Sequence, residues 1–446
     1  MTAVSPGGGD RGLGRLAAAA VAAGALTGVV GALFRTALTA AEGGRGVFLA
    51  WVHRWPAAGW VLPVLAAAAA AGLSRALVRL APEAAGGGLP HVEAVVRGEV
   101  PPPSRRLVPV KFAGGLLSIG SGMALSGEGL TEQMGAALGE ETSRALRLPP
   151  SDRILVLASC AGAGLGVAFD APLAGALFAL EQVARRIGVR TLVASLLTSA
   201  AAVGALRFLL GDFREFPLGP VPAPSVLSVV PFAVLGGLLG LLGAAYGASI
   251  VGAVERMDRL SRVPVEVRAA LVGAVVGLVA WVDPGLVGDG HVINQRILAG
   301  GMTLAGVAVL AGVRWVLGPL CFSTRLPGGL IMPTLVVGAA LGTLAHAVAG
   351  PLLGGALPSA PAVAAVGMAA FFAAVIRAPF TGILLVAEAT ATSTLLLPML
   401  AACGTAVAVA TALRSPPVYD ALRARLVATS SPPRSPPPPS PRPPTA

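Results

Sequence analysis

The sequence predicts an all-α, polytopic membrane protein built from two inverted-topology repeats, with broken helices that meet near the middle of the bilayer. Three observations favour this fold. Of the 446 residues, 55% are hydrophobic and only 12% are charged, and the mean hydropathy is +0.80. So few charges could not cover the surface of a soluble protein of this length. Short motifs also recur about 200 residues apart, and glycine-rich segments interrupt the apolar stretches.

Seven apolar stretches are candidates for membrane-spanning helices, since a helix that crosses a bilayer needs about 20 apolar residues. They cover residues 16–34, 60–73, 154–180, 226–250, 271–282, 302–322 and 384–413. Several are too short or too long for one simple crossing. We therefore expect tilted, paired and broken helices.

The repeats are three pairs of motifs in the same order. The pairs are 82–98 with 284–300, 135–139 with 338–342, and 169–181 with 376–388. The last pair reads FDAPLAGALFALE and IRAPFTGILLVAE, with Ala, Pro, Gly, Leu and Glu at the same five spacings. We predict a first membrane repeat over 15–215 and a second over 222–415. If each crosses the membrane an odd number of times, the second is inserted upside down.

The two ends differ from the rest in composition. Residues 1–14 are predicted to be disordered, and 416–446 to be a short C-terminal segment followed by a cytoplasmic tail rich in Pro, Ser and Arg. The formal charge is +11, but the arginines are scattered over loops and ends. We interpret them as topology signals, with both termini cytoplasmic and a multi-pass location in the plasma membrane. The expected partner is the lipid bilayer, with no nucleic acid.

Enzyme chemistry has little support. Cys160, Cys321 and Cys403 lie in apolar context, and the histidines have no metal-ligand spacing, so we expect no metal and no cofactor. Asp289 and Asp420 faintly resemble the pair of intramembrane aspartyl proteases. Their order along the chain is reversed, however, and the first glycine of the protease motif is missing. The prediction is that the protein is not an enzyme.

Glycine-rich breaks occur at residues 86–90, 126–133, 288–292 and 326–333. A helix that begins at such a break points unpaired N–H groups and a partial positive charge at one place. Several converging helix starts would bind a small inorganic anion without a buried lysine or arginine. The alternative is that the glycines only allow helices to pack closely. A cation transporter would need carboxylates or carbonyls where these amides are expected.

Glu128 is the most informative single residue. It lies between two glycines in a long apolar context, where a carboxylate must pair, take up a proton or contact water. At a helix start it would compete with an anion for the same amides. We therefore predict that Glu128 is a gate and a candidate proton carrier. The alternative is a simple helix cap.

These motifs resemble those of the CLC family of chloride channels and chloride/proton antiporters. GGGLP resembles the family's first anion-binding loop, GSGIP, and SGEGLTEQ resembles the second, G(K/R)EGP. GGLIMP resembles the third, GxFxP, and Tyr419 falls where the family has a tyrosine at the central anion. The resemblance implies Glu128 as the external gating glutamate, chloride as the transported ligand, and a homodimer with one pore per subunit. It implies anion-binding positions at Gly86, Gly87, Gly88, Gly127, Gly129, Gly329, Leu330, Ile331 and Tyr419.

This chain departs from the family pattern at several of these positions. Gly87 replaces a serine, Gly127 a basic residue, Leu130 a proline and Ile331 an aromatic residue. The change at Gly87 leaves a fluoride-handling relative open as an alternative.

The departure with the largest functional consequence is Gln182, at the position where coupled exchangers of the family have an inner, proton-carrying glutamate. Glutamine cannot titrate, so the sequence favours a passive chloride channel, with chloride/proton exchange as the alternative. The neighbouring Glu181 is rotated by about 100° on a helix. Because Glu388 occupies the equivalent place in the second repeat, we expect both to have a structural role in capping or packing.

Overall fold

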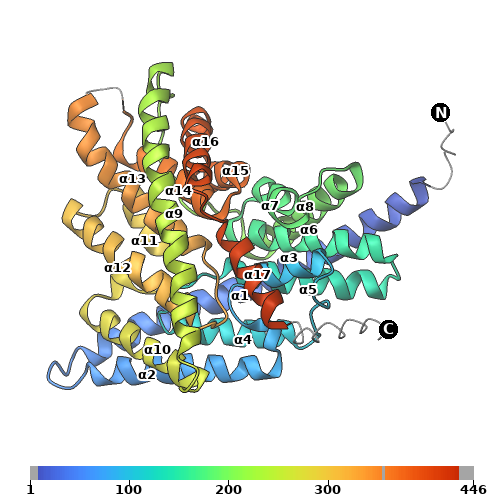
Figure 1. The fold of residues 1–446 in the computed structure, drawn as a ribbon, viewed down its shortest axis with the longest axis horizontal. Coiled ribbons are helices and arrows are strands. Elements are labelled where there is room, and N and C mark those ends of the chain that lie inside the picture. The colour runs from blue at the N-terminus through green and yellow to red at the C-terminus, as the bar shows by residue number, and fades with distance from the viewer. Residues whose placement is uncertain (1–8, 354–356, 431–446) are drawn as a thin grey trace, which may run out of the picture.

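A computed structural model describes residues 9–353 and 357–430 of the protein (Figure 1). In the first part of the chain the helices are α1 (Gly9–Val52), α2 (Val61–Leu77), α3 (Leu89–Val96), α4 (Leu107–Gly120), α5 (Glu128–Ala145), α6 (Pro150–Phe169), α7 (Pro172–Phe178) and α8 (Val189–Leu210). The second part contains α9 (Val229–Arg259), α10 (Val265–Val282), α11 (His291–Leu298), α12 (Leu304–Ser323), α13 (Ile331–Leu353), α14 (Ala360–Ile376), α15 (Pro379–Thr390) and α16 (Leu396–Ala412), and α17 (Val418–Ser430) follows.

The helices from α1 to α8 and from α9 to α16 follow the same plan. In the first set α5 packs on α6 and α1 packs along α8, and in the second set α13 packs on α14 and α9 along α16. Contacts between equivalent helices, α2 with α10 and α7 with α15, join the two sets (Figure 1). The two-repeat organisation follows from this arrangement, while the predicted bounds 15–215 and 222–415 stay predictions.

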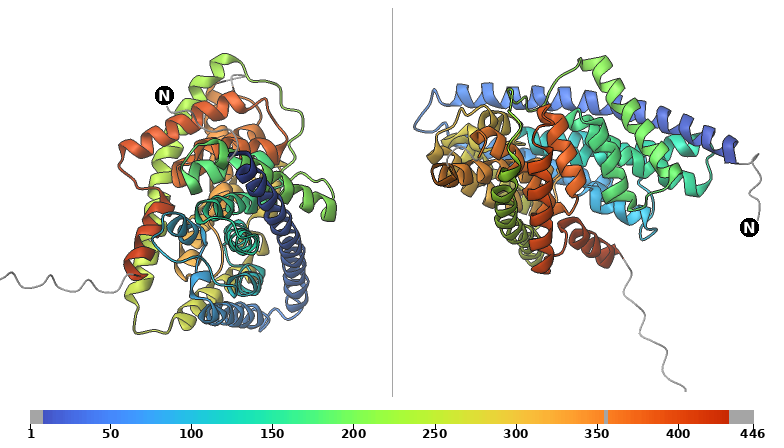
Figure 2. Two further views of the ribbon diagram at one scale, coloured as in Figure 1. Left: turned by 90° about the vertical axis from the view of Figure 1, so that its right-hand side faces the viewer. Right: turned by 90° about the horizontal axis from the view of Figure 1, so that it is seen from above.

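Within the described residues, eight helices are long and apolar enough to cross a membrane, and α1 runs along most of the molecule (Figure 2). The expectation of broken helices is confirmed. The predicted stretch 154–180 is two helices, because the chain turns at Asp170, which has a φ of 52°, before Pro172 begins α7. The sequence reading missed α8, α13 and α14 as separate apolar helices.

The predicted disorder of residues 1–14 is wrong for residues 9–14, which belong to α1. The following turn is held by packing: Arg15 donates hydrogen bonds to the carbonyls of Leu146 (3.2 Å) and Arg147 (3.4 Å), and Leu16 is buried. Residues 1–8 lie outside the described residues. At the other end α17 occupies 418–430, and the predicted tail beyond it also lies outside them.

The repeated motif GAALG makes a close helix contact in each half. A Cβ on Gly135 would lie 2.4 Å from the carbonyl oxygen of Cys160, and one on Gly338 would lie 2.7 Å from that of Gly367. Only glycine allows α5 to approach α6, and α13 to approach α14, this closely. For this motif, close packing is the explanation.

The repeated glutamates cap helices across the two halves. The carboxylate of Glu388, in α15, accepts hydrogen bonds from the first-turn amides of α7, at Leu173 (3.0 Å) and Ala174 (2.7 Å). Glu181 accepts from the equivalent amides of α15, at Phe380 (3.2 Å) and Thr381 (2.8 Å). The predicted structural role of this pair is confirmed. Each repeat supplies the anion that satisfies a helix start in the other.

Candidate functional site

All four glycine-rich breaks end where a helix begins, as the sequence predicted. The breaks lead into α3 at Leu89, α5 at Glu128, α11 at His291 and α13 at Ile331. Each helix start directs several backbone N–H groups away from its own helix. The site therefore depends on where these four starts point.

Three of the starts converge on one place, which we call the junction: Gly87, Gly129 and Gly329. A Cβ on Gly129 would lie 2.3 Å from the carbonyl oxygen of Gly87, and one on Gly329 would lie 2.9 Å from the nitrogen of Gly129. The starts of α3, α5 and α13 are thus in direct backbone contact, which requires glycine.

Two hydrogen bonds pair the loops before α5 and α13. The nitrogen of Ser126 donates to the oxygen of Gly329 (3.1 Å), and the nitrogen of Gly329 donates to the oxygen of Ser126 (2.7 Å). Gly329 lies 203 residues after Ser126, as Ile331 lies 203 residues after Glu128. Equivalent residues of the two repeats therefore bond to each other, and the pseudo-two-fold axis passes between them.

Buried cations fix the breaks before α3 and α11. The Nζ of Lys111 donates to the carbonyls of Ala84 (3.0 Å) and Gly86 (2.7 Å). In the second repeat Arg314 donates in the same way to Gly288 (2.7 Å) and Val287 (3.0 Å). These cations hold carbonyl oxygens of the breaks, and the amides of Gly86 and Gly288 donate to the carbonyls of Arg325 (3.1 Å) and Gly122 (2.8 Å).

Glu128 lies at the first position of α5 and is buried, and its Oε2 accepts no hydrogen bond from the described residues. It lines a cavity of ≈ 270 Å³ together with Phe34, Arg35 and His291. His291 begins α11, so the fourth break opens on this cavity, where the carboxylate of Asp289 accepts from the His291 nitrogen (2.9 Å). The Glu128 carboxylate thus lies at a helix start, beside both the junction and the cavity.

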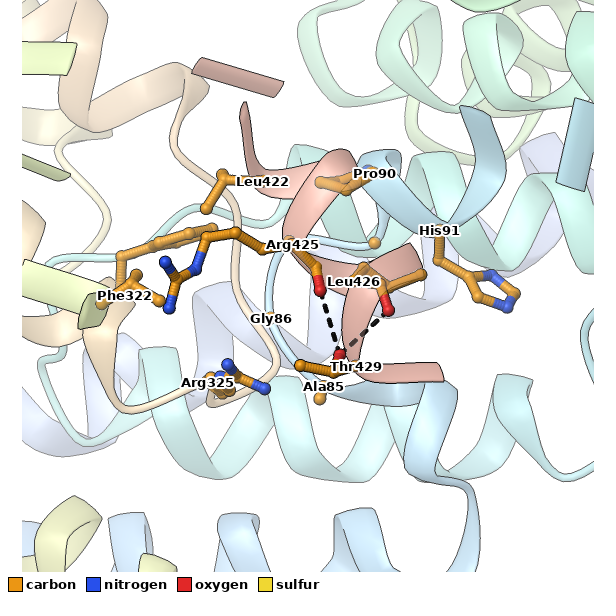
Figure 3. Close-up of a pocket in the computed structure, with 13 residues that line it drawn as sticks. Ala85, Gly86, Pro90, His91, Phe322, Arg325, Leu422, Arg425, Leu426 and Thr429 are labelled. Atoms are coloured by element: carbon orange, nitrogen blue, oxygen red, sulfur yellow. Dashed lines mark hydrogen bonds between the residues drawn. The ribbon is translucent and has the colours of Figure 1, made fainter. Parts of the chain in front are cut away.

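A second cavity, of ≈ 110 Å³, opens on the first loop (Figure 3). Gly86, Gly87 and Gly88 line it, with Phe322, Arg325 and Arg425. Figure 3 shows both guanidinium groups on the Phe322 side of the pocket, with His91 on the opposite side. The two cavities share no lining residue. The junction lies between them, because Gly87 lines one, Gly127 and Glu128 line the other, and Gly129 contacts Gly87.

The remaining predicted positions lie at the starts of α5 and α13, on α17, and in the turn after α7. Leu330 and Ile331 are buried at the start of α13, and Gly127 immediately precedes α5. Tyr419, on α17, is buried and interacts electrostatically with Glu128. Gln182 lies in a π-helical turn after α7, where its Nε2 donates to the Oε1 of Glu93 (2.8 Å).

Two buried carboxylates were missed by sequence reasoning. Glu132 is one turn beyond Glu128 on α5, and Glu93 is on α3, and both side chains are fully buried. The signal for Glu132 was its spacing of four residues from Glu128, which places both on one helix face. Glu93 had no local signal, because its neighbour Gln182 comes from a distant segment.

A family model described as voltage gated chloride channel matches residues 68–411. The chain belongs to this family, the CLC family. The expected resemblance is confirmed, and so is the expected fold class.

Curated CLC relatives carry exchanger names. The chain is 35% identical over 371 residues to the H(+)/Cl(-) exchange transporter ClcA of Vibrio parahaemolyticus, a match that covers 81% of this chain and 79% of the relative. It is 30% identical over 416 residues to ClcA of Salmonella typhimurium, covering 92% and 88%.

Solved CLC structures have the same fold. A slow cyanobacterial Cl−/H+ antiporter matches with a TM-score of 0.89 and 27% identity, over 96% of this chain and 100% of that one. A CLC-type fluoride/proton antiporter matches with a TM-score of 0.74, over 89% of this chain and 95% of that one. Its 20% identity supports the fold alone.

This CLC protein is therefore a multi-pass membrane transporter of anions, with chloride as the transported ion, and it is not an enzyme. The two aspartates of the protease hypothesis belong to separate networks. Asp289 caps α11, whereas Asp420 pairs with Arg185 at 2.9 Å. The relatives favour exchange, which the sequence ranked second, over the passive channel that it ranked first.

Proposed function

We propose that the protein exchanges chloride for protons across the membrane, with Glu128 as the coupling group. The observation that carries this proposal is the position of the Glu128 carboxylate, at the start of α5 between the junction and a cavity. The exchanger names of the curated relatives support it.

The proposed mechanism is competition for the junction. Chloride would bind at the first, second and third loops, at the glycines 86–88, 127 and 129 and at 329–331, with the Tyr419 hydroxyl beside it. The amide donors would be those of residues other than Gly86 and Gly329, whose nitrogens already donate to carbonyl oxygens. An ionised Glu128 would occupy the same positive end of α5 and exclude the anion. Protonation removes the carboxylate charge, so chloride can take its place. Each exchange cycle would therefore move a proton and a chloride in opposite directions.

The test is a single recording of both ions. Purified protein is reconstituted in liposomes with an outward chloride gradient, and external chloride and pH are measured together. Exchange predicts that the chloride gradient drives protons uphill, and that a proton gradient drives chloride. Chloride movement without uphill proton movement would contradict the proposal and favour a passive chloride channel. Repeating the recording with fluoride tests the anion selectivity, because a fluoride-handling protein would transport fluoride in preference to chloride.

We also propose that the protein forms a homodimer in the plasma membrane, with both termini on the cytoplasmic side. Support comes from the family resemblance and from the arginines near the two ends. A cysteine introduced at Thr445 should react with an impermeant maleimide only after the cells are permeabilised. Native cysteines do not interfere, since Cys160, Cys321 and Cys403 are buried. Crosslinking in native membranes tests the dimer.

A further inference from the structure

Glu132 is a buried carboxylate with no hydrogen-bond partner. Its side chain is fully buried in α5, and neither Oε1 nor Oε2 accepts a hydrogen bond from the described residues. A charged group in such a place is unstable unless it is compensated. A carboxylate kept only for packing would have been matched by donors, as Glu181 and Glu388 are. Glu132 therefore requires another explanation.

Glu132 lies between two other buried carboxylates. Glu128 is one helical turn earlier on α5, so the two side chains share a face and their Cβ atoms are about 5–6 Å apart. Glu93 lies on α3, which packs against α5 and brings its charge close enough to act on Glu132, as the charge of Glu128 does. Tyr419 interacts with all three. We call Glu128, Glu132 and Glu93 the carboxylate row.

The row ends near the surface at Glu93. Its Oε1 is held by Gln182 at 2.8 Å, and its Oε2 lies 3.8 Å from the Nε of Arg423 on α17. Arg423 also binds the carboxylate of Glu99 (2.6 Å), whose side chain is 30% exposed. A charge or proton that reaches Glu93 is therefore one side chain away from groups that contact solvent.

Cations lie unevenly along the row, with more of them at the Glu93 end than beside Glu128 and Glu132. Lys111 interacts with Glu132, but its Nζ donates to the Ala84 and Gly86 carbonyls. Arg423, Arg185 and Arg97 lie at the Glu93 end. Lys111 is thus the one cation beside Glu128 and Glu132 among the described residues, and two ionised carboxylates there would leave one buried negative charge uncompensated. A single mobile proton shared along the row removes that charge.

We propose that Glu132 and Glu93 carry protons between Glu128 and the α17 side of the molecule, replacing the route that a glutamate at position 182 would provide. The inference rests on the proposed exchange. In each step the O–H bond of one carboxyl group breaks and an O–H bond forms on the next carboxylate, directly or through a bridging water. No oxidant or reductant is needed. Gln182 is a positioning residue, because its amide orients Glu93 and does not titrate.

The test compares Glu132→Gln with wild type in the two-ion liposome recording. Glutamine has the size of glutamate but carries no exchangeable proton at neutral pH. Uphill proton movement should fall about a hundredfold, as is usual when a positioned proton-transfer group is removed, while chloride efflux continues without coupling. Glu93→Gln should have the same effect. Glu132→Asp keeps a titratable group and should retain measurable coupling.

A matched control is Glu141→Gln on the same helix, where the carboxylate pairs with Arg105 at 3.0 Å outside the row. It should leave both fluxes at wild-type levels. If wild type couples the two ions and Glu132→Gln couples them equally well, the relay is overturned while the exchange stands. If wild type moves no protons uphill, the exchange itself is wrong and the relay falls with it. If Glu132→Gln and Glu132→Asp both reduce chloride and proton flux in equal proportion, Glu132 is a structural residue and the relay is overturned.

Discussion

Buried charges around the junction divide by sign into two tasks. Lys111 and Arg314 are fully buried and donate to backbone carbonyls of the glycine-rich breaks. Glu128 and Glu132 are buried with oxygens that accept no hydrogen bond from the described residues. Cations therefore hold the loops in place, while these two carboxylates keep oxygens without a hydrogen-bond partner. The proposed competition between an anion and Glu128 for helix-start amides relies on this division.

Glu128→Gln should abolish proton movement and make chloride flux faster and independent of pH. The neutral amide imitates the protonated gate and no longer excludes an anion from the start of α5. Chloride efflux from liposomes between pH 5 and pH 8 measures this against wild type. An unchanged rate together with an unchanged pH response would remove the gating role from Glu128.

Gly87→Ser should change the selectivity between chloride and other anions without unfolding the protein. A Cβ at Gly87 would lie 3.4 Å from Cε2 of Phe322 and 3.5 Å from the Gly328 oxygen, so a side chain fits and adds a hydroxyl donor beside the junction. Competition between chloride and fluoride in efflux assays measures this change in selectivity.

The matched variant is Gly129→Ala, whose Cβ would lie 2.3 Å from the Gly87 oxygen. It should cost about 1–3 kcal/mol through overpacking and reduce the flux of every anion. If Gly87→Ser behaves like Gly129→Ala, the first loop is more crowded than the geometry indicates.

At the scale of elements, local sequence signals predicted helix starts better than helix spans. The breaks at 126–133 and 326–333 correctly place the starts of α5 and α13, because glycine removes the side chain that a close junction would exclude. By contrast α8, with an arginine near each end, and the alanine-rich α14 were not recognised as apolar helices. α8 packs along α1 and α14 along α13, and a single segment does not reveal such contacts.

The crossed caps make a symmetric prediction for stability. Glu388→Gln and Glu181→Gln should each lower the unfolding free energy by about 1.5–3 kcal/mol, the usual range for hydrogen bonds to a charged group. Both caps accept two backbone amides, so the two losses should be of the same order, and Glu181, which also accepts from the Thr381 hydroxyl (2.7 Å), should show the larger one. Thermal unfolding of the detergent-purified variants measures them.

Glu266→Gln is the control for the caps. It removes a carboxylate from an ion pair with Arg79, whose side chain is 70% exposed, so its effect should stay below about 1 kcal/mol. If the control and the cap variants lose the same stability, the caps contribute nothing beyond surface charge.

At the scale of the whole molecule, the segment between α8 and α9 acts as a connector. Glu215 lies in it with a buried side chain, and binds Arg35 of the first repeat through two hydrogen bonds of 2.8 and 3.0 Å. The same carboxylate pairs with His291 of the second repeat. The sequence indicated the two repeats but not this link, since partners 180 residues apart leave no local pattern. The same reason hid the contact between Glu93 and Gln182.

Glu215→Gln should therefore weaken the packing of the two repeats and lower the stability of the protein. One neutral amide cannot satisfy a guanidinium and an imidazole, and breaking a buried ion pair costs about 3 kcal/mol or more. Arg35 and His291 both line the cavity beside Glu128, so chloride flux should fall together with the thermal midpoint in detergent.

Asp212→Asn is the control in the same segment, since its carboxylate is 66% exposed and 3.6 Å from Arg207. That variant should remain within about 0.5 kcal/mol of wild type. If Glu215→Gln matches the control in both stability and flux, the connector does not stabilise the packing of the repeats. The contacts of α2 with α10 and of α7 with α15 then hold them together.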